Sequence, residues 1–430
     1  MKITSILIAA GLMVQTAALI AQAGPVPAKP QSQGIYIAGA TAHLGNGQVI
    51  ENSVIAFDKG KITFVGAAGQ TPRVNLSAYT RVDAAGKHVY PGLIAPNAQL
   101  GLVEIEAVRA TRDGSEIGEL NPNIRSLVAY NTDSHVIPTV RSQGILLAQV
   151  VPGGGRISGQ SSVVQLDAWN WEDAAYQTDD GVHLDWPEQF RFNRFSGELI
   201  KNEGYAASIQ ELEMFFKEAQ AYIQKAAPET RNLKFEAARG LFDGSKRLFI
   251  HTNSAKSIQQ SVLFAQPYGF KIVIVGGRES WLVADFLKAN NVAVILESTQ
   301  SLPATEDADV DQPFKTPALL QKAGVLYCIG HEGFWQQRNL AFQAGQAVGF
   351  GLGKEEAISA LTLNTAKILG IDARTGSLEV GKDANLFVSE GDVLDMRSSV
   401  VTQAYIQGRG IDLDNKQKAL YRRFKQRYEK

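Results

Sequence analysis

Short alternating runs of apolar and polar residues near the N-terminus give way to longer apolar runs further along the chain. Residues 34–65 alternate with a period of two around turn sequences such as Gly45-Asn46-Gly47 and Lys59-Gly60. This pattern predicts several short β-strands in a small β unit that cannot close by itself. Residues 144–151 form an apolar run, which is typical of a parallel strand covered on both faces.

Strand and helix patterns then alternate through the middle of the chain. Residues 207–226 carry apolar side chains at helical spacing and predict a long amphipathic helix, and residues 358–369 predict a closing helix. Repeated β-α units of this kind imply a parallel sheet, and the length of the chain favours a (β/α)8 barrel. The strand-like runs between these helices are 161–166, 248–250, 272–275, 292–295 and 325–329, and the intervening helical patterns are 257–265, 280–289 and 317–323.

The first residues have the pattern of an export signal. Lys2 precedes a largely apolar run over residues 3–20, and the small-x-small sequence Ala21-Gln22-Ala23 follows it. This pattern predicts a signal peptide over residues 1–23 and a periplasmic location. Polar residues within the run argue against the alternative, a membrane anchor, so no integral membrane segment is expected after cleavage.

The last residues, 414–430, predict a basic helix. Its apolar side chains are Leu420, Tyr421, Phe424 and Tyr428, which favours a helix that packs through these residues and is solvated elsewhere. A role in docking to a membrane surface or to a partner is the alternative.

Composition narrows the class of protein. The chain has 430 residues, enough for a barrel and a smaller second domain. It carries 42 basic and 43 acidic residues, so there is no global electrostatic attraction to nucleic acid or to an anionic membrane. The single cysteine, Cys328, cannot form an intrachain disulfide, and its apolar surroundings predict a core residue.

Three segments resemble the amidohydrolase superfamily. The sequence PGLI at 91–94 resembles the family's first barrel strand, GSLEVGKDAN at 376–385 resembles its return strand, and NTAKILGI at 364–371 resembles its closing helix. The resemblance implies a (β/α)8 barrel beside a composite β-sandwich, and it is greatest to exported imidazolonepropionase-like and prolidase-like hydrolases. The implied division is a barrel over 89–372, a sandwich built from 32–88 and 373–413, and a basic helix over 414–430.

The positions at which this resemblance implies metal ligands carry mostly other residues. Asn97 and Gln99 stand where the family has the two histidines of H-x-H, and Gly276 stands where it has a sixth-strand histidine. His251 resembles the fifth-strand histidine, and Glu332 replaces the ligand aspartate. Amide oxygens are weak ligands for zinc, and one histidine with one carboxylate is too few for a catalytic site. Zinc or another divalent metal is therefore implied by resemblance only.

Three functions remain open at this point. The first is hydrolysis of non-peptide C–N bonds or dipeptides, with His251 and Glu332 as the surviving participants. The second, which the site chemistry favours, is a non-catalytic binding module or a partner subunit of an active relative. The third is metal-free acid/base chemistry by Glu332 and His331, although these two residues could equally form a surface loop pair.

Two histidines have alternative interpretations. His251 could equally be a buried histidine bonded to a backbone carbonyl, and His183 falls in a predicted loop over 178–187. The expected ligand is a small amide or peptide-like molecule. A homo-oligomer and a complex with an active paralogue are the assemblies to be considered.

Overall fold

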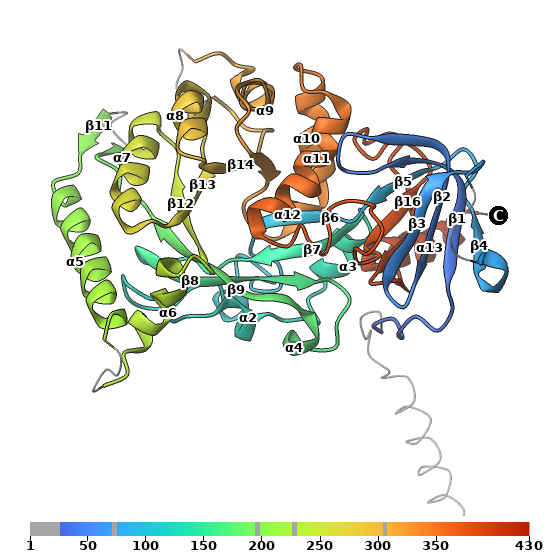
Figure 1. Cartoon of the computed structure of the whole chain (residues 1–430), viewed down its shortest axis with the longest axis horizontal. Coiled ribbons are helices and arrows are strands. Elements are labelled where there is room, and N and C mark those ends of the chain that lie inside the picture. Colours follow the sequence, from blue (N-terminus) through green and yellow to red (C-terminus); the bar gives the residue numbers. More distant parts are fainter. Residues whose placement is uncertain (1–25, 71–74, 194–197, 226–229, 304–307, 430) are drawn as a thin grey trace, which may run out of the picture.

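Two eight-stranded sheets contain nearly all the strands of the computed structural model (Figure 1). The structure describes residues 26–70, 75–193, 198–225, 230–303 and 308–429. The predicted signal peptide lies outside these residues. A separate hairpin is formed by β10 (Phe190–Asn193) and β11 (Glu198–Lys201).

The first sheet joins strands from both ends of the described chain. Its central contact is β5 (His88–Pro91), which pairs with β1 in parallel and with β16 antiparallel. The prediction that both ends build one β unit agrees with this pairing, and the two-layer form of a sandwich stays a prediction. The other strands are β1 (Ile35–His43), β2 (Val49–Asp58), β3 (Lys61–Ala67), β4 (Thr80–Asp83), β16 (Leu386–Ser389), β17 (Val401–Ile406) and β18 (Arg409–Gly410).

The turn between β2 and β3 has the chemistry expected from the sequence. Lys59 and Gly60 have φ values of 49° and 79°. Positive φ at both central residues is the requirement of a type I′ hairpin turn, which glycine meets without strain. This turn thereby sets the register of an antiparallel pair in which Asp58 lies opposite Lys61.

The second sheet is a nearly closed, barrel-like sheet. Its edge strands are β6 and β15, and just beyond them the backbone N–H of Gln99 donates to the carbonyl of Gly333 at 2.9 Å. The alternating patterns predicted a (β/α)8 barrel, and the structure has the coarser features of that fold, a mixed α/β chain with a barrel-like sheet. The strand order is β6 (Leu93–Ala98), β7 (Ile145–Val150), β8 (Ile157–Gln165), β9 (Ala175–Asp185), β12 (Arg247–Thr252), β13 (Lys271–Gly276), β14 (Ala293–Glu297) and β15 (Tyr327–Gly330).

This sheet differs from eight parallel strands at β8, which runs antiparallel to β7 and β9. Only residues 151–156 connect β7 to β8, and a parallel crossover needs a dozen residues or more. The first barrel strand also begins later than expected: Val89 and Tyr90 lie in β5 of the other sheet, and the barrel strand starts at Leu93.

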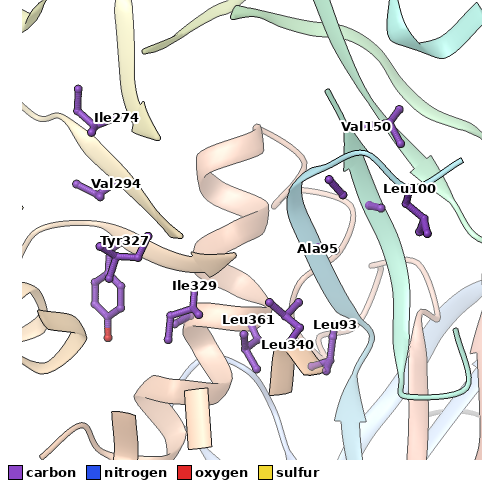
Figure 2. Packing of buried hydrophobic residues seen from close by; sticks show 14 of the residues in the cluster. Leu93, Ala95, Leu100, Val150, Ile274, Val294, Tyr327, Ile329, Leu340 and Leu361 are labelled. Carbon is purple, nitrogen blue, oxygen red and sulfur yellow. The ribbon is translucent and has the colours of Figure 1, made fainter. Parts of the chain in front are cut away.

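Helices cover the outside of the barrel. Figure 2 shows Leu340 and Leu361 from two of them packed beside Leu93 and Ile329 of the barrel strands. The predicted closing helix 358–369 is two helices, α11 (Lys354–Leu361) and α12 (Leu363–Leu369), because Thr362 between them has the non-helical backbone angles φ −131° and ψ −90°. None of the helices in the described ranges is long and apolar enough to cross a bilayer.

The helices have the following bounds. The longer ones are α5 (Tyr205–Ile223), α6 (Leu233–Phe242), α7 (Ala255–Ala265), α9 (Gln312–Ala323), α10 (Leu340–Val348), α11 (Lys354–Leu361), α12 (Leu363–Leu369) and α13 (Lys416–Tyr428). The shorter ones are α2 (Ser126–Ala129), α3 (Val136–Arg141), α4 (Trp171–Ala174) and α8 (Ala284–Ala289). Single 3₁₀ turns are η1 (Leu76–Ala78), η2 (Arg109–Thr111), η3 (Gln266–Tyr268), η4 (Ser280–Val283) and η5 (Trp335–Asn339).

Candidate functional site at the barrel mouth

A pocket lies where the last four barrel strands end. Strands β12 to β15 are parallel, so their C-terminal ends meet at one rim, which is where barrel enzymes place their reacting groups. The pocket is lined by Gly276 at the end of β13, Glu297 at the end of β14, and His331 and Glu332 just after β15. The structure therefore gathers three of the predicted site residues and adds Glu297, which the sequence analysis missed.

The side chains of Asn97 and Gln99 have different neighbours. Asn97 lies near the end of β6, and Gln99 follows the strand. The side-chain amide of Asn97 is buried and donates from Nδ2 to Oε1 of Glu297 at 2.6 Å. The amide nitrogen of Gln99 lies 3.7 Å from the place that a Cβ would take on Gly153. The two amide side chains therefore lie against different parts of the chain.

His251 on β12 is bonded into the interior of the barrel. Its Nε2 lies 2.9 Å from Nδ1 of His183 on β9, and Nε2 of His183 lies 2.8 Å from Oγ of Ser161. The Ser161 hydroxyl donates to Oδ1 of Asp180 at 2.7 Å. Gln149 donates to Oδ2 of the same aspartate at 2.8 Å, and its Oε1 accepts the backbone N–H of Asn97 at 3.2 Å.

The protons of this chain can be assigned from its donors and acceptors. Burial lowers the pKa of His183 well below its ordinary value, so the ring is neutral and carries one N–H. Because Ser161 gives its only proton to Asp180, it must accept from Nε2–H of His183. Nδ1 of His183 is then an acceptor, and it receives Nε2–H of His251. The Nε2 nitrogen of His251 is thus committed to a hydrogen bond inside the barrel.

The prediction that His183 lies in a loop was wrong, because residues 175–185 form β9 and the ring is fully buried. The polar run Gln177 to Asp180 at the middle of this strand obscured the apolar pattern. The alternation of Val182 and Leu184 with His183 and Asp185 was the signal that could have revealed it.

Negative charge accumulates around the pocket. Burial, followed by the nearby carboxylates of Glu332 and Asp185, raises the pKa of Glu297 to about 7. Inside the barrel, burial raises the pKa of Asp180 to about 6 and also lowers the pKa of His251. The group at the rim with the most strongly raised pKa is therefore Glu297.

His331 and Glu332 do not form a side-chain pair. Nδ1 of His331 lies 2.6 Å from the backbone carbonyl oxygen of Glu332, while the Glu332 side chain is exposed beside the pocket. Within the described ranges, no group of three or more His, Cys, Asp or Glu side chains is placed to hold a metal ion.

Gly276 has a backbone that resists a side chain. Its φ is +95°, and a Cβ built on it would lie 2.7 Å from Oδ1 of Asn253 and 3.1 Å from the carbonyl oxygen of Thr252. A histidine at this position would therefore require both a strained backbone and a shift of its neighbours.

Replacing Gly276 by alanine is expected to lower the free energy of unfolding by about 2–3 kcal/mol, through backbone strain and steric conflict together. Gly47→Ala is the matched control, since Gly47 has φ +89° but no atom within 4 Å of its Cβ position. Urea-induced unfolding of both variants measures the difference. Equal losses would show that the neighbours of Gly276 give way freely.

Comparison with known proteins finds similarity to one enzyme family. A model of the amidohydrolase family matches residues 330–410. Imidazolonepropionase from Symbiobacterium thermophilum is 25% identical over 378 residues, which cover 79% of this chain and 84% of that protein. These matches support the resemblance of the chain to the amidohydrolase superfamily.

Other known proteins match the chain in sequence or in fold. Amidohydrolase tasK from Hapsidospora irregularis is 39% identical over 114 residues, so the chain spans only 12% of that protein and 24% of its own length is matched. A solved amidohydrolase from Thermotoga maritima has a TM-score of 0.74 at 24% identity, covering 88% of this chain and 99% of that one. A putative prolidase from Bifidobacterium longum has a TM-score of 0.55 at 16% identity, covering 93% and 100%. These two structures support the fold.

The family match covers part of the candidate site. Residues 330–410 include His331 and Glu332, the helices α11 and α12, and the strands β16 and β17. The positions of Asn97, His251 and Gly276 lie outside that match, so their roles rest on the geometry described above.

Proposed function

We propose that this protein is a non-catalytic or catalytically impaired amidohydrolase homologue that binds a small amide or peptide-like molecule at the barrel mouth. The observation that carries the proposal is the hydrogen bonding of the side chains at the implied ligand positions. His251 is bonded through Nε2 to His183, and Asn97 turns its N–H to Glu297. Asn97 therefore turns a donor, and not a lone pair, toward Glu297, and His251 keeps only its Nδ1 lone pair as a possible ligand.

The residues do not fit a catalytic zinc site of the usual kind. Such a site takes three protein ligands and keeps a fourth position for water, which the metal activates. Here Gly276 has no side chain, Gln99 lies beside Gly153, and Asn97 acts as a hydrogen-bond donor. Glu332 is the one carboxylate left at an implied ligand position.

The proposal extends to organisation and location. We propose a signal peptide over 1–23, a periplasmic mature chain, a barrel over 89–372, and a composite sandwich from 32–88 and 373–413. A homo-oligomer or a complex with an active paralogue is the proposed assembly. The pairing of β5 with both β1 and β16 supports the composite unit.

Elemental analysis tests the absence of a catalytic zinc. We expect full-length protein purified without chelators from zinc-supplemented cells to hold well below one zinc per chain, since a catalytic site would hold about one. About one zinc or more per chain would overturn the proposal. Ligand binding is tested by thermal unfolding with small amides, dipeptides and lactams, because a ligand at about 100 times its Kd stabilises the native state by about 2.7 kcal/mol.

Restoring histidines at the implied ligand positions tests whether the barrel can still hold a metal ion when its ligands are present. We expect Asn97→His with Gln99→His to raise zinc uptake above that of the unmodified protein. The control variant, Asn46→His with Gln224→His, places the same side chains in two separate regions of the surface. Gly276 is left unchanged because its backbone disfavours any side chain.

Metal-free acid/base hydrolysis is the second candidate function, and the raised pKa of Glu297 beside Glu332 favours it. The contact of His331 with a backbone carbonyl supports the two glutamates as the acid and base. Hydrolysis of an amide in the presence of chelator, lost in Glu332→Gln and kept in His331→Gln, is the expected result. Hydrolysis lost on chelation would contradict this candidate.

A further inference from the structure

The C-terminal helix α13 exposes the side chains that were expected to pack it. The exposed fractions are 40% for Leu420, 65% for Tyr421, 52% for Phe424 and 76% for Tyr428, and no residue of this helix is buried. The prediction of a helix packed through these four side chains was therefore wrong. The helix keeps an apolar face without a partner in the described chain.

These four residues lie on one side of the helix. Leu420, Phe424 and Tyr428 are spaced by four residues, and Tyr421 precedes Phe424 by three, so all four fall within about 100° of the helix circumference. Basic residues border this stripe along both edges. The guanidinium of Arg423 lies 5.8 Å from the centre of the Phe424 ring, and that of Arg427 lies 5.9 Å from the centre of the Tyr428 ring.

The first turn of α13 is fixed to the barrel side of the molecule. Thr139 on α3 donates to the Gln417 side chain at 2.8 Å, and Asn415 donates to Oγ of Ser142 at 3.0 Å. Asn415 also caps the helix by accepting the N–H of Lys418. The apolar stripe therefore belongs to a helix held at its start. Figure 1 shows α13 beside the sheet that joins the two chain ends, far from α5 along the long axis.

The charge of α13 is strongly positive although the whole chain has a net charge of −1. Residues 416–428 contain six basic residues, which are Lys416, Lys418, Arg422, Arg423, Lys425 and Arg427, and no acidic residue. Asp412, Asp414 and Glu429 flank the helix. Of the six cations, Arg422 pairs with Asp414 and Lys425 pairs with Glu429.

We propose that α13 docks this protein on the surface of a bilayer that contains anionic phospholipids. An exposed apolar stripe of leucine and aromatic side chains, edged by lysine and arginine, is the pattern of a helix that lies in the headgroup region. The aromatic rings and Leu420 enter the boundary with the acyl chains, and the cations contact lipid phosphates. This inference does not depend on the proposed function of the barrel.

Two other occupants fit the helix less well. A second copy of the chain packed stripe to stripe would bring two helices with six cations each together, and like charges repel at such an interface. The phosphates of a nucleic acid would neutralise the cations but would leave the apolar stripe exposed, because contacts to the phosphate backbone are ionic. Anionic lipid accounts for both the charge and the stripe.

Vesicle co-sedimentation of the full mature chain tests the proposal. We expect binding to vesicles of 3:1 phosphatidylcholine and phosphatidylglycerol to exceed binding to phosphatidylcholine vesicles by at least about tenfold, and to fall as salt is raised. Equal sedimentation with both vesicles, or none with either, would overturn the proposal.

Substitutions separate the contribution of α13 to vesicle binding from the effect of positive charge elsewhere on the surface. Leu420→Ser with Phe424→Ser, and separately Arg423→Glu with Arg427→Glu, are each expected to reduce binding to anionic vesicles roughly tenfold. The control, Lys225→Glu with Lys234→Glu, makes the same charge change on exposed residues near α5 and α6 and is expected to leave binding unchanged. Circular dichroism and thermal unfolding check that each variant is folded.

Three results would contradict the proposal. One is unchanged vesicle binding when the stripe is replaced by serines. Another is self-association of the unmodified chain, in the absence of vesicles, that the serine variant loses. The last is binding to duplex DNA without binding to anionic vesicles.

Discussion

Replacing Asp167 by alanine is expected to lower the free energy of unfolding by about 3–5 kcal/mol, because it leaves a buried arginine without its counter-ion. The Asp167 side chain is fully buried, and its Oδ1 accepts from Nη1 of Arg141 at 2.6 Å. The Arg141 side chain is only 4% exposed, and its Nε and Nη2 atoms have no partner among the described residues. Burial lowers the pKa of Arg141, and Asp167 is the largest influence that opposes this.

Asp167 also connects parts of the chain that are distant in sequence. Its Oδ2 accepts the backbone N–H of Ala28 at 2.8 Å and lies 3.3 Å from Nη1 of Arg409 on β18. The residue thus ties the barrel to the N-terminal segment and to the other sheet. Losing it should lower the stability of the whole molecule and not of one loop.

Urea-induced unfolding of Asp167→Ala measures this loss. The matched control is Asp395→Ala, which removes a partner of Arg397, a side chain that is 88% exposed. The control is expected to change stability by less than about 1 kcal/mol. Arg141→Met should cost less than Asp167→Ala, because Asp167 keeps Arg409 as a partner. A loss at Asp167 no larger than that of the control would refute the role of this ion pair.

The stability of the protein is expected to fall between about pH 4.5 and pH 7 through Glu297. The pKa of its carboxyl group is raised from the ordinary 4.5 to about 7 in the folded protein. Below pH 4.5 both the folded and the unfolded state hold the proton, so nothing is lost. As pH rises toward 7 the unfolded state releases the proton while the folded state keeps it, which favours unfolding. Above about pH 7 the loss is complete, with an upper bound of roughly 3 kcal/mol.

Glu297→Gln should remove this loss. The amide oxygen of glutamine can still accept from Nδ2 of Asn97, while the charge that burial and Glu332 disfavour is gone. We expect the variant to be more stable than the unmodified chain by about 1–3 kcal/mol at pH 8 and equally stable at pH 4.5.

Urea unfolding at both pH values tests this expectation, and the exposed residue change Glu390→Gln serves as the control. A Glu297→Gln variant that differs from the unmodified chain equally at pH 4.5 and pH 8 would show that the carboxyl group has no raised pKa. A fall in stability confined to pH values above 7 would contradict it as well.

Several parts of the fold could be predicted from local sequence. The apolar run 144–151 contains β7, the helical pattern 207–226 contains most of α5, and Lys59-Gly60 forms the hairpin turn. Each of these depends on the character of neighbouring residues, which sets backbone propensity and one buried face. β9 was missed because of its polar centre, where Asp180 points into a barrel interior that contains the hydrogen-bonding partners Ser161 and Gln149.

The candidate site could be predicted only in part. The residues that occupy the implied ligand positions follow from the sequence, and so does the weakness of Asn97 and Gln99 as zinc ligands. Glu297 was missed because nothing near it in sequence marks its role. Its importance comes from a hydrogen bond to Asn97, 200 residues away, and from the charge of Glu332 across the rim.

The amino-acid sequence alone determined which chemical groups this protein has, where its tight turns form, and that amides and a glycine replace the family's histidines. The tertiary structure decided that His183 binds His251 across 68 residues, that burial raises the pKa of Glu297 at the rim to about 7, and that the stripe of α13 is exposed. The physical reason is that the chemical type of a residue and its backbone preference are local properties of the chain. Hydrogen-bond pairing, burial and electrostatic environment depend on which distant segments the fold brings together.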